Sequence, residues 1–200
     1  MPERLPGMDR QNQTEPVTET TPFAKSQFTT GTGKPGTIPG EWPGFRGAKG
    51  DNLAAGTAPL ARQWKELWRV DLGEGYAGAA VRNGRVYVLD YDQARQADAL
   101  RCLSLADGQE IWRFSYPVKT KRNHGMSRTV PTVTDRYVVA FGPKCHVICL
   151  DALTGQFQWG LDLVKEFNAE VPQWYAGLLT YNLLRGVMLI GAATGTGGLA

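Results

Sequence analysis

From residue 65 onward, short apolar runs alternate with polar residues and are separated by turn-forming pairs. The clearest example is 78–92, GAAVRNGRVYVLDYD, in which Asn83 and Gly84 separate two apolar runs. An Asn-Gly pair between two such runs is a strong local signal for a β-hairpin. The segment 65–72, KELWRVDL, alternates in the same way and predicts a further strand. The pattern at 163–171 also allows a turn or two of helix.

The hairpin at 78–92 begins a series of predicted strands that occurs twice. In the first series, 99–105 is a strand, and a turn at Asp107-Gly108 leads into a last strand at 109–116. The second series consists of a hairpin over 128–142 with its turn at Thr134-Asp135, a strand over 145–151, a turn at Thr154-Gly155 and a strand over 156–163. Each series therefore predicts four short strands joined by tight turns.

The two series are related in sequence as well as in pattern. The stretch CLSLADGQEIWRF at 102–114 returns as CLDALTGQFQWGL at 149–161, and Trp68, Trp112 and Trp159 are spaced 44 and 47 residues apart. A four-stranded antiparallel unit that recurs at such a period is typical of a β-propeller blade. A large flat Trp fills the wedge between neighbouring blades, and a Gly four residues earlier permits a turn that a Cβ would hinder. We therefore expect blade docking to involve Trp68, Gly108, Trp112, Gly155 and Trp159.

These patterns predict an all-β chain: a partial β-propeller of four-stranded antiparallel blades over 41–200. Blade strands start at about 65, with full blades at about 76–116 and 128–162 and an incomplete blade at 175–200. Residues 1–40 are rich in Thr, Pro and Gly and have few large apolar side chains, so we expect a disordered tail there.

The segment 178–200 allows two interpretations. It contains a strand-like GVMLIG but no clear hairpin, which suits a blade that is cut short or altered. It also has a single charged residue, Arg185, and is long enough to span a bilayer. The density of Gly and Thr favours the blade, so we expect no transmembrane helix.

Composition excludes several classes of function. The 200 residues are 42% hydrophobic and 20% charged, which suits a globular core, and a net charge of +3 gives no support for nucleic-acid binding. Three cysteines form no disulfide framework. The N-terminus shows neither the basic start nor the apolar run of a signal peptide.

The repeat residues resemble a known family. LSLADGQEIW and LDALTGQFQW are similar to the docking signature of pyrroloquinoline-quinone-like (PQQ-like) propeller repeats, although Asp107 stands where Thr is usual. WPGFRG at 42–47, NHGMSRTVP at 123–131 and VPQWYAG at 171–177 extend the resemblance to planctomycete-type members of the family. The wider group includes the outer-membrane assembly factor B, a binding scaffold, and quinoprotein dehydrogenases.

The resemblance implies a periplasmic or envelope location and a role as a non-enzymatic binding scaffold. The alternative is a fragment of a PQQ-dependent quinoprotein dehydrogenase, whose PQQ and Ca²⁺ would need an oxygen ligand set beside a catalytic carboxylate. The acidic residues of this chain mostly fall at turns, where Asp is expected anyway. We therefore predict no cofactor and no catalytic residue in this chain, with PQQ and calcium only under the alternative.

Two motifs imitate binding sites. GEGYAG at 73–78 fits the Gly-x-Gly-x-x-Gly of dinucleotide sites, with Asp90 following, but a hairpin rather than a helix comes next. A tight entry into an innermost strand is the better interpretation. Cys145 and Cys149 lie about 13 Å apart if both are on one strand, too far to share a zinc ion. Cys102 and Cys149 are equivalent in the repeat, so we expect the cysteines to pack in the core.

The remaining candidate is the basic segment 119–129, KTKRNHGMSRT, which leads into an innermost strand and should lie at the propeller face. We expect the candidate face for a protein partner or an anionic small ligand to include Lys121, Arg122, His124, Arg128, Tyr76, Trp174 and Tyr175. The alternative is a solvated connection between blades. Ser127, His124 and Asp135 do not form a credible catalytic triad from one short segment.

Overall fold

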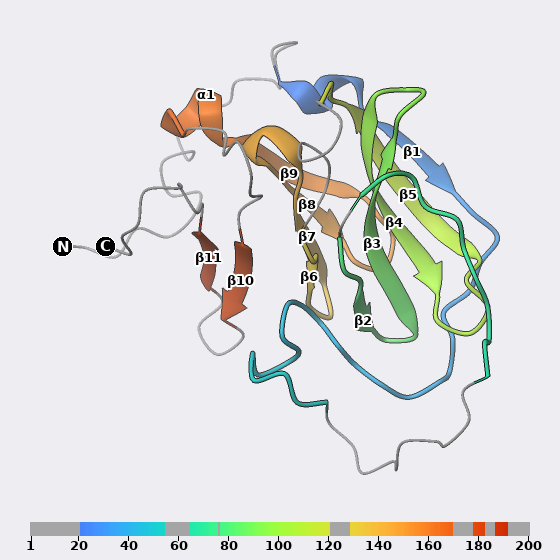
Figure 1. Cartoon of the computed structure of the whole chain (residues 1–200). Helices are drawn as coiled ribbons and strands as arrows, with labels where there is room; N and C mark the ends of the chain where they lie inside the picture. Colours follow the sequence, from blue (N-terminus) through green and yellow to red (C-terminus); the bar gives the residue numbers. More distant parts are fainter. Residues whose placement is uncertain are drawn as a thin grey trace.

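The computed structural model describes residues 21–54, 65–75, 77–120, 129–169, 178–182 and 187–191. Over these residues the chain is built mainly of antiparallel strands, arranged as three sheets side by side (Figure 1). The prediction of an all-β, partial β-propeller is confirmed.

The first blade is a five-stranded sheet. Its repeat strands are β2 (Ala80–Arg82), β3 (Arg85–Asp92), β4 (Ala97–Ser104) and β5 (Glu110–Pro117). β1 (Gln27–Thr30) adds to the outer edge of β5, so that the order is β1-β5-β4-β3-β2. The turn at Asn83-Gly84 joins β2 to β3, as the sequence predicts, and both residues have positive φ, the conformation that this tight turn requires.

The second blade is a four-stranded sheet with the order β6-β7-β8-β9. Its strands are β6 (Thr132–Val133), β7 (Tyr137–Phe141), β8 (His146–Asp151) and β9 (Phe157–Asp162). The short helix η3 (Pro143–Cys145) lies between β7 and β8, and α1 (Leu163–Phe167) follows β9. The pattern at 163–171 allowed a turn or two of helix, and α1 is that turn.

A third element follows the second blade. β10 (Leu178–Asn182) and β11 (Val187–Gly191) form an antiparallel hairpin beside β6 and β7 (Figure 1). The sequence alone showed no clear hairpin here, but β11 falls within the strand-like GVMLIG segment. None of the helices in the described part of the chain combines the length and the apolarity of a membrane span.

The two full blades share details beyond strand order. In each, a register shift falls after the cysteine that is paired with the tryptophan: Cys102 opposite Trp112, and Cys149 opposite Trp159. The turn that follows is closed by equivalent backbone hydrogen bonds in both blades. In the first blade Ser104 N donates to the oxygen of Gln109, and in the second Asp151 N donates to that of Gln156, each at 2.8 Å. The backbone N–H of each turn glycine adds one more bond. A bulge of this kind increases the local twist, so both blades are twisted at the same place.

Apolar side chains alternate between the two faces of each blade. The main cluster lies between the blades and joins Tyr87, Leu100 and Trp112 of the first to Val138 and Ile148 of the second. The other face of the first blade carries Val86, Val88 and Leu103, covered by Trp68 and Val70. The other face of the second blade carries Val139, Phe141 and Val147, with Cys145 and Cys149.

The prediction of a disordered tail over 1–40 is corrected for residues 21–40, and residues 1–20 lie outside the described residues. Residues 21–44, here called the strap, contain η2 (Pro22–Lys25) and β1, and Phe23 is only 6% exposed. The strap then passes beneath the blades (Figure 1), and Trp42 exchanges two backbone hydrogen bonds of 2.8 Å with Val81 on β2. Low apolar content did not prevent order, because the backbone groups pair with strand edges and one aromatic ring is inserted between blades.

Two further expectations are wrong. Residues 65–72 form no strand in the structure; they have no regular secondary structure, and Trp68 and Val70 pack on the first blade. Cys145 does not share a strand with Cys149, because η3 ends at Cys145 and β8 starts at His146. All three cysteines are buried and free.

Candidate functional site

The blades meet through a tryptophan placed on a glycine turn. Gly155 has a φ of +74°, and a Cβ on it would lie 2.7 Å from Trp112 Cδ2 of the preceding blade. Gly108, with a φ of +72°, has the same relation to Trp68, at 2.6 Å from Cε3. Each glycine therefore meets two requirements at once, a left-handed turn and close approach of an indole ring. Trp159 is partly buried against the cluster of Val139, Phe141 and Val147 on the other face of the second blade.

The two docked indoles differ in their hydrogen bonds. Trp68 Nε1 donates to the carbonyl oxygen of Leu105 at 2.9 Å. The equivalent carbonyl in the second blade, that of Ala152, accepts instead from Tyr87 Oη at 3.1 Å, and Trp112 Nε1 has no hydrogen-bond partner among the described residues. Burial is the main reason that the pKa of Tyr87 is raised far above its usual value, so its hydroxyl remains a donor.

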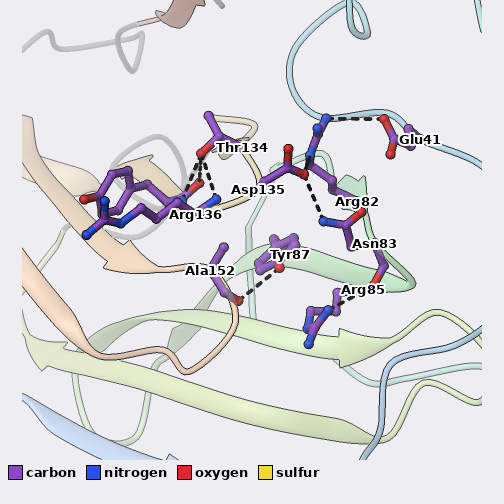
Figure 2. A network of polar contacts seen from close by, with 10 residues as sticks. Glu41, Arg82, Asn83, Arg85, Tyr87, Thr134, Asp135, Arg136 and Ala152 are labelled. Atoms are coloured by element: carbon purple, nitrogen blue, oxygen red, sulfur yellow. Dashed lines mark hydrogen bonds and ion pairs between the residues drawn. The ribbon is translucent and has the colours of Figure 1, made fainter. Parts of the chain in front are cut away.

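An ion-pair network joins the strap and the two blades at the end of the sheets that carries the β2–β3 and β6–β7 turns (Figure 2). Arg82 on β2 donates through Nε to Asp135 Oδ1 at 2.9 Å and through Nη1 to Glu41 Oε2 at 3.3 Å. Asn83 donates to the same oxygen of Asp135 at 3.1 Å. The hydrogen bond from Arg82 is the largest cause of a lowered pKa at Asp135, so this carboxylate stays charged as a structural partner.

A second charged network lies on the face of the first blade that carries Val86, Val88 and Leu103, opposite the cluster between the blades. Arg101 donates to Asp90 at 3.1 Å and to Glu110 at 2.6 Å, and both Arg101 and Asp90 are nearly buried. Gly73 N donates to the other oxygen of Asp90 at 2.6 Å, and a Cβ on Gly73 would clash with the Tyr91 carbonyl. The glycine motif at 73–78 is followed by the β2–β3 hairpin, so Gly73 and Asp90 serve packing rather than a nucleotide site.

The opposite end of the sheets, here called the link end, is where β5 and β9 end and where β7 connects to β8. A pocket of about 430 Å³ lies there in the seam between the blades, covered by the start of the strap. Its polar lining consists of Lys119, Lys144, Lys165, His146, Asp162 and Thr21. The three lysines come from three elements: the end of the first blade, η3 and α1.

The pocket combines exposed lysine side chains with a buried histidine, His146, whose pKa is lowered. Burial is the first cause that lowers the pKa of His146, to about 4; Asp162 acts against this, and Lys144 and Lys165 add to it. Phe23 and Tyr116 pack on the imidazole, with ring centroids 5.7 and 5.6 Å away. His146 is therefore neutral at neutral pH.

The single carboxylate of the pocket is already engaged. Asp162 caps α1 by accepting from Lys165 N at 3.2 Å, and its other oxygen lies 3.8 Å from both Lys165 Nζ and His146 Nε2. With the imidazole neutral, three ammonium groups face the carboxylate of Asp162 and, beside it, that of Glu166, whose Oε1 accepts from Asp162 N at 3.1 Å. The pocket thus has a net positive charge.

The seven residues that the sequence indicated as the ligand face all lie outside the described residues: Tyr76, Lys121, Arg122, His124, Arg128, Trp174 and Tyr175. Lys119, which starts the same basic segment, lines the pocket. Sequence reasoning missed Lys144, His146 and Lys165. The basic start of the segment was a usable signal for Lys119, whereas the others reach the pocket only through the β7–β8 turn and α1.

A Ca²⁺ and quinone site would need a cluster of carboxylates. Across the described ranges, no three His, Cys, Asp or Glu side chains gather in a way that could hold a metal ion. These residues therefore offer no donor set that fits the group.

Four-stranded antiparallel sheets placed side by side, with a tryptophan of one on a glycine turn of the next, define a β-propeller repeat protein. Residues 47–172 match the family model described as "Outer membrane protein assembly factor BamB". The match covers more than half of the chain, and the chain therefore belongs to this family. A comparison with curated protein sequences gives no significant match.

Solved structures give similarities that cover part of the chain. BamB from Moraxella catarrhalis matches 47% of this chain and 27% of its own, at 22% identity and a TM-score of 0.36. The quinohemoprotein alcohol dehydrogenase ADHIIG from Pseudomonas putida HK5 matches 48% of this chain and 14% of its own, at 23% identity and a TM-score of 0.37. A europium-containing methanol dehydrogenase matches 46% and 16%, at 16% identity and a TM-score of 0.34. The chain thus spans about a quarter or less of the length of these structures.

Proposed function

We propose that this chain is part of a non-enzymatic binding scaffold of the bacterial cell envelope, located in the periplasm, that holds a protein partner at its link end. The observation that carries the proposal is the match of residues 47–172 to the model of an outer-membrane assembly factor. A propeller suits this role because rigid, docked blades present the connecting segments as one continuous surface.

The charge of the link end supports an acidic partner. Lys119, Lys144 and Lys165 are exposed there, and the sequence places further cations directly after Lys119. Surface cations of this kind speed and orient the encounter with a partner of opposite charge, and their effect falls with salt.

Site-specific photo-cross-linking tests the proposal. The full chain carries a photoreactive residue at position 119 or, as the control, at Lys34 on the strap, and each form is irradiated in envelope extract. We expect a defined set of cross-linked proteins at position 119 that fades as salt is added, and none of that set at position 34. The same set at both positions would contradict a binding face at the link end.

The enzymatic alternative needs its own test. Calorimetric titration of the full chain with pyrroloquinoline quinone and Ca²⁺ should give no saturable heat. Micromolar binding would overturn the scaffold proposal and favour a quinoprotein oxidoreductase.

A further inference from the structure

The lysine pocket at the link end has the features of a small-molecule site, formed by the same three lysines that the proposed partner face presents. We propose that it binds a phosphomonoester, with the phosphate held by Lys119, Lys144 and Lys165 and the carbon part of the ester against the apolar wall.

Charge is the first argument. Three lysines line the pocket against the carboxylate of Asp162 and, beside it, that of Glu166, whose Oε1 accepts from Asp162 N at 3.1 Å, so cations are in excess there. A phosphomonoester has about −1.5 to −2 charges at neutral pH. Lysine is suited to this task because its ammonium group acts as a point charge with three donors.

Two buried polar atoms of the pocket residues are the second argument. Thr21 Oγ1 and His146 Nδ1 are buried and have no hydrogen-bond partner in the described part of the chain, and the His146 side chain is only 7% exposed. Buried polar groups are nearly always paired, so two unpaired ones among the residues of one pocket indicate a partner that the described residues do not supply. A bound ester or the water it orders would supply that partner.

The backbone at Lys144 is the third argument. Lys144 and Cys145 have φ values of +57° and +61°, so two consecutive non-glycine residues adopt the left-handed conformation. Such positions are concentrated at ligand sites, because the surrounding structure must hold them. Here the turn places Lys144 in the pocket lining, next to His146.

Size and lining distinguish an ester from inorganic phosphate. A volume of about 430 Å³ lies within the range of roughly 300–1,000 Å³ that is usual for small-molecule sites. Beside the polar groups, the pocket is lined by Pro22, Pro117, Val118 and Val164. An apolar wall of this kind has no use for a bare phosphate but can cover the carbon atoms of an ester.

Titration of the full chain with glycerol 3-phosphate tests the proposal, with the imidazole signal of His146 followed by NMR to locate binding. We expect saturable binding that shifts the His146 signal. In Lys144→Gln/Lys165→Gln the affinity should fall at least about tenfold, since each hydrogen bond to a charged group is worth at least that factor. The control Lys34→Gln/Lys49→Gln removes the same charge from exposed positions outside the pocket and should bind within twofold of the parent.

The outcomes are distinct. Absence of saturable binding, or equal weakening in both double variants, would overturn the proposal. Lys119→Gln, which leaves η3 and α1 unchanged, should also weaken binding. This variant tests the proposal even if the double variant fails to fold. Inorganic phosphate and phosphatidylcholine vesicles with or without phosphatidic acid then separate the sources. Preference for glycerol 3-phosphate supports a soluble ester, preference for phosphatidic acid supports a lipid headgroup, and equal binding of inorganic phosphate overturns the role of the apolar wall.

Discussion

The indole of Trp112, on the last strand of one blade, lies against Gly155 in the first turn after β8 of the next blade. The ring is 1% exposed and belongs to the cluster that joins both sheets. One side chain thus connects two units that have no strand pairing with each other, which explains why the Trp and the Gly recur at the same period.

Replacing Trp112 by Ala should lower the free energy of unfolding by about 3–5 kcal/mol, the usual cost of truncating a buried aromatic side chain. Urea unfolding followed by circular dichroism measures it, with Phe45→Ala as the control because Phe45 is 49% exposed. A loss below about 1 kcal/mol would show that the ring does not hold the blades together.

The strap should contribute to stability through Phe23. Its ring meets Tyr116 of the first blade at 5.1 Å and His146 and Phe157 of the second at 5.7 and 5.9 Å between centroids. Phe23→Ala should therefore cost about 3 kcal/mol in the same urea experiment and increase cleavage of the strap by added protease. Unchanged cleavage together with unchanged stability would mean that the strap is held by its backbone bonds alone.

Burial of His146 should make stability depend on pH. Its pKa is about 4 in the folded chain against an ordinary 6.5, so the unfolded chain binds more protons between these values. The stability that comes from the neutral imidazole is complete above pH 6.5 and is lost as pH falls toward 4, by about 3 kcal/mol in all. His146→Phe keeps a ring between Phe23 and Tyr116 and should lose this part of the dependence.

The measurement compares urea midpoints of the parent and His146→Phe at pH 7 and pH 4.5. Asp162, Lys144, Lys165 and the second histidine, His124, are present in both proteins, so the difference between the two isolates the replaced imidazole. Parallel pH profiles would show that His146 is not protonated on unfolding.

The basic segment after Lys119 should contribute to partner binding more than other exposed cations do. Arg122→Ala/Arg128→Ala should reduce recovery of the proteins cross-linked from position 119, because Arg donates in pairs to carboxylates and phosphates. Arg69→Ala/Arg95→Ala is the matched control, since these side chains are 78% and 74% exposed. Equal recovery in both would make 121–128 a solvated connection.

Sequence predicted the features that depend on local chemistry. Asn83-Gly84 and the Gly-x-x-x-Trp repeats specify turns and docking from neighbouring residues, so the blades could be recognised without a structure. The strap could not be recognised in this way, because Phe23 is buried only through contacts with aromatic rings more than ninety residues away in the sequence. The alternation at 65–72 predicted a strand that is absent, since Trp68 docks there without any edge-to-edge pairing.

The lysine pocket was beyond prediction for the same reason. Lys144 and Lys165 are ordinary surface residues in the sequence, and the β7–β8 turn and α1 bring them beside Lys119. The single local clue was the basic segment itself, which indicated the link end but not the seam between blades.

The strap also sets an order of events during biosynthesis. It leaves the ribosome before both blades, yet its binding sites are the outer edge of β5, the rings around His146 and the inner edge of β2, all of which are made later. Pairings so distant in sequence form slowly, because the chain between them must first be confined. We therefore expect the strap to dock last, once both blades have formed.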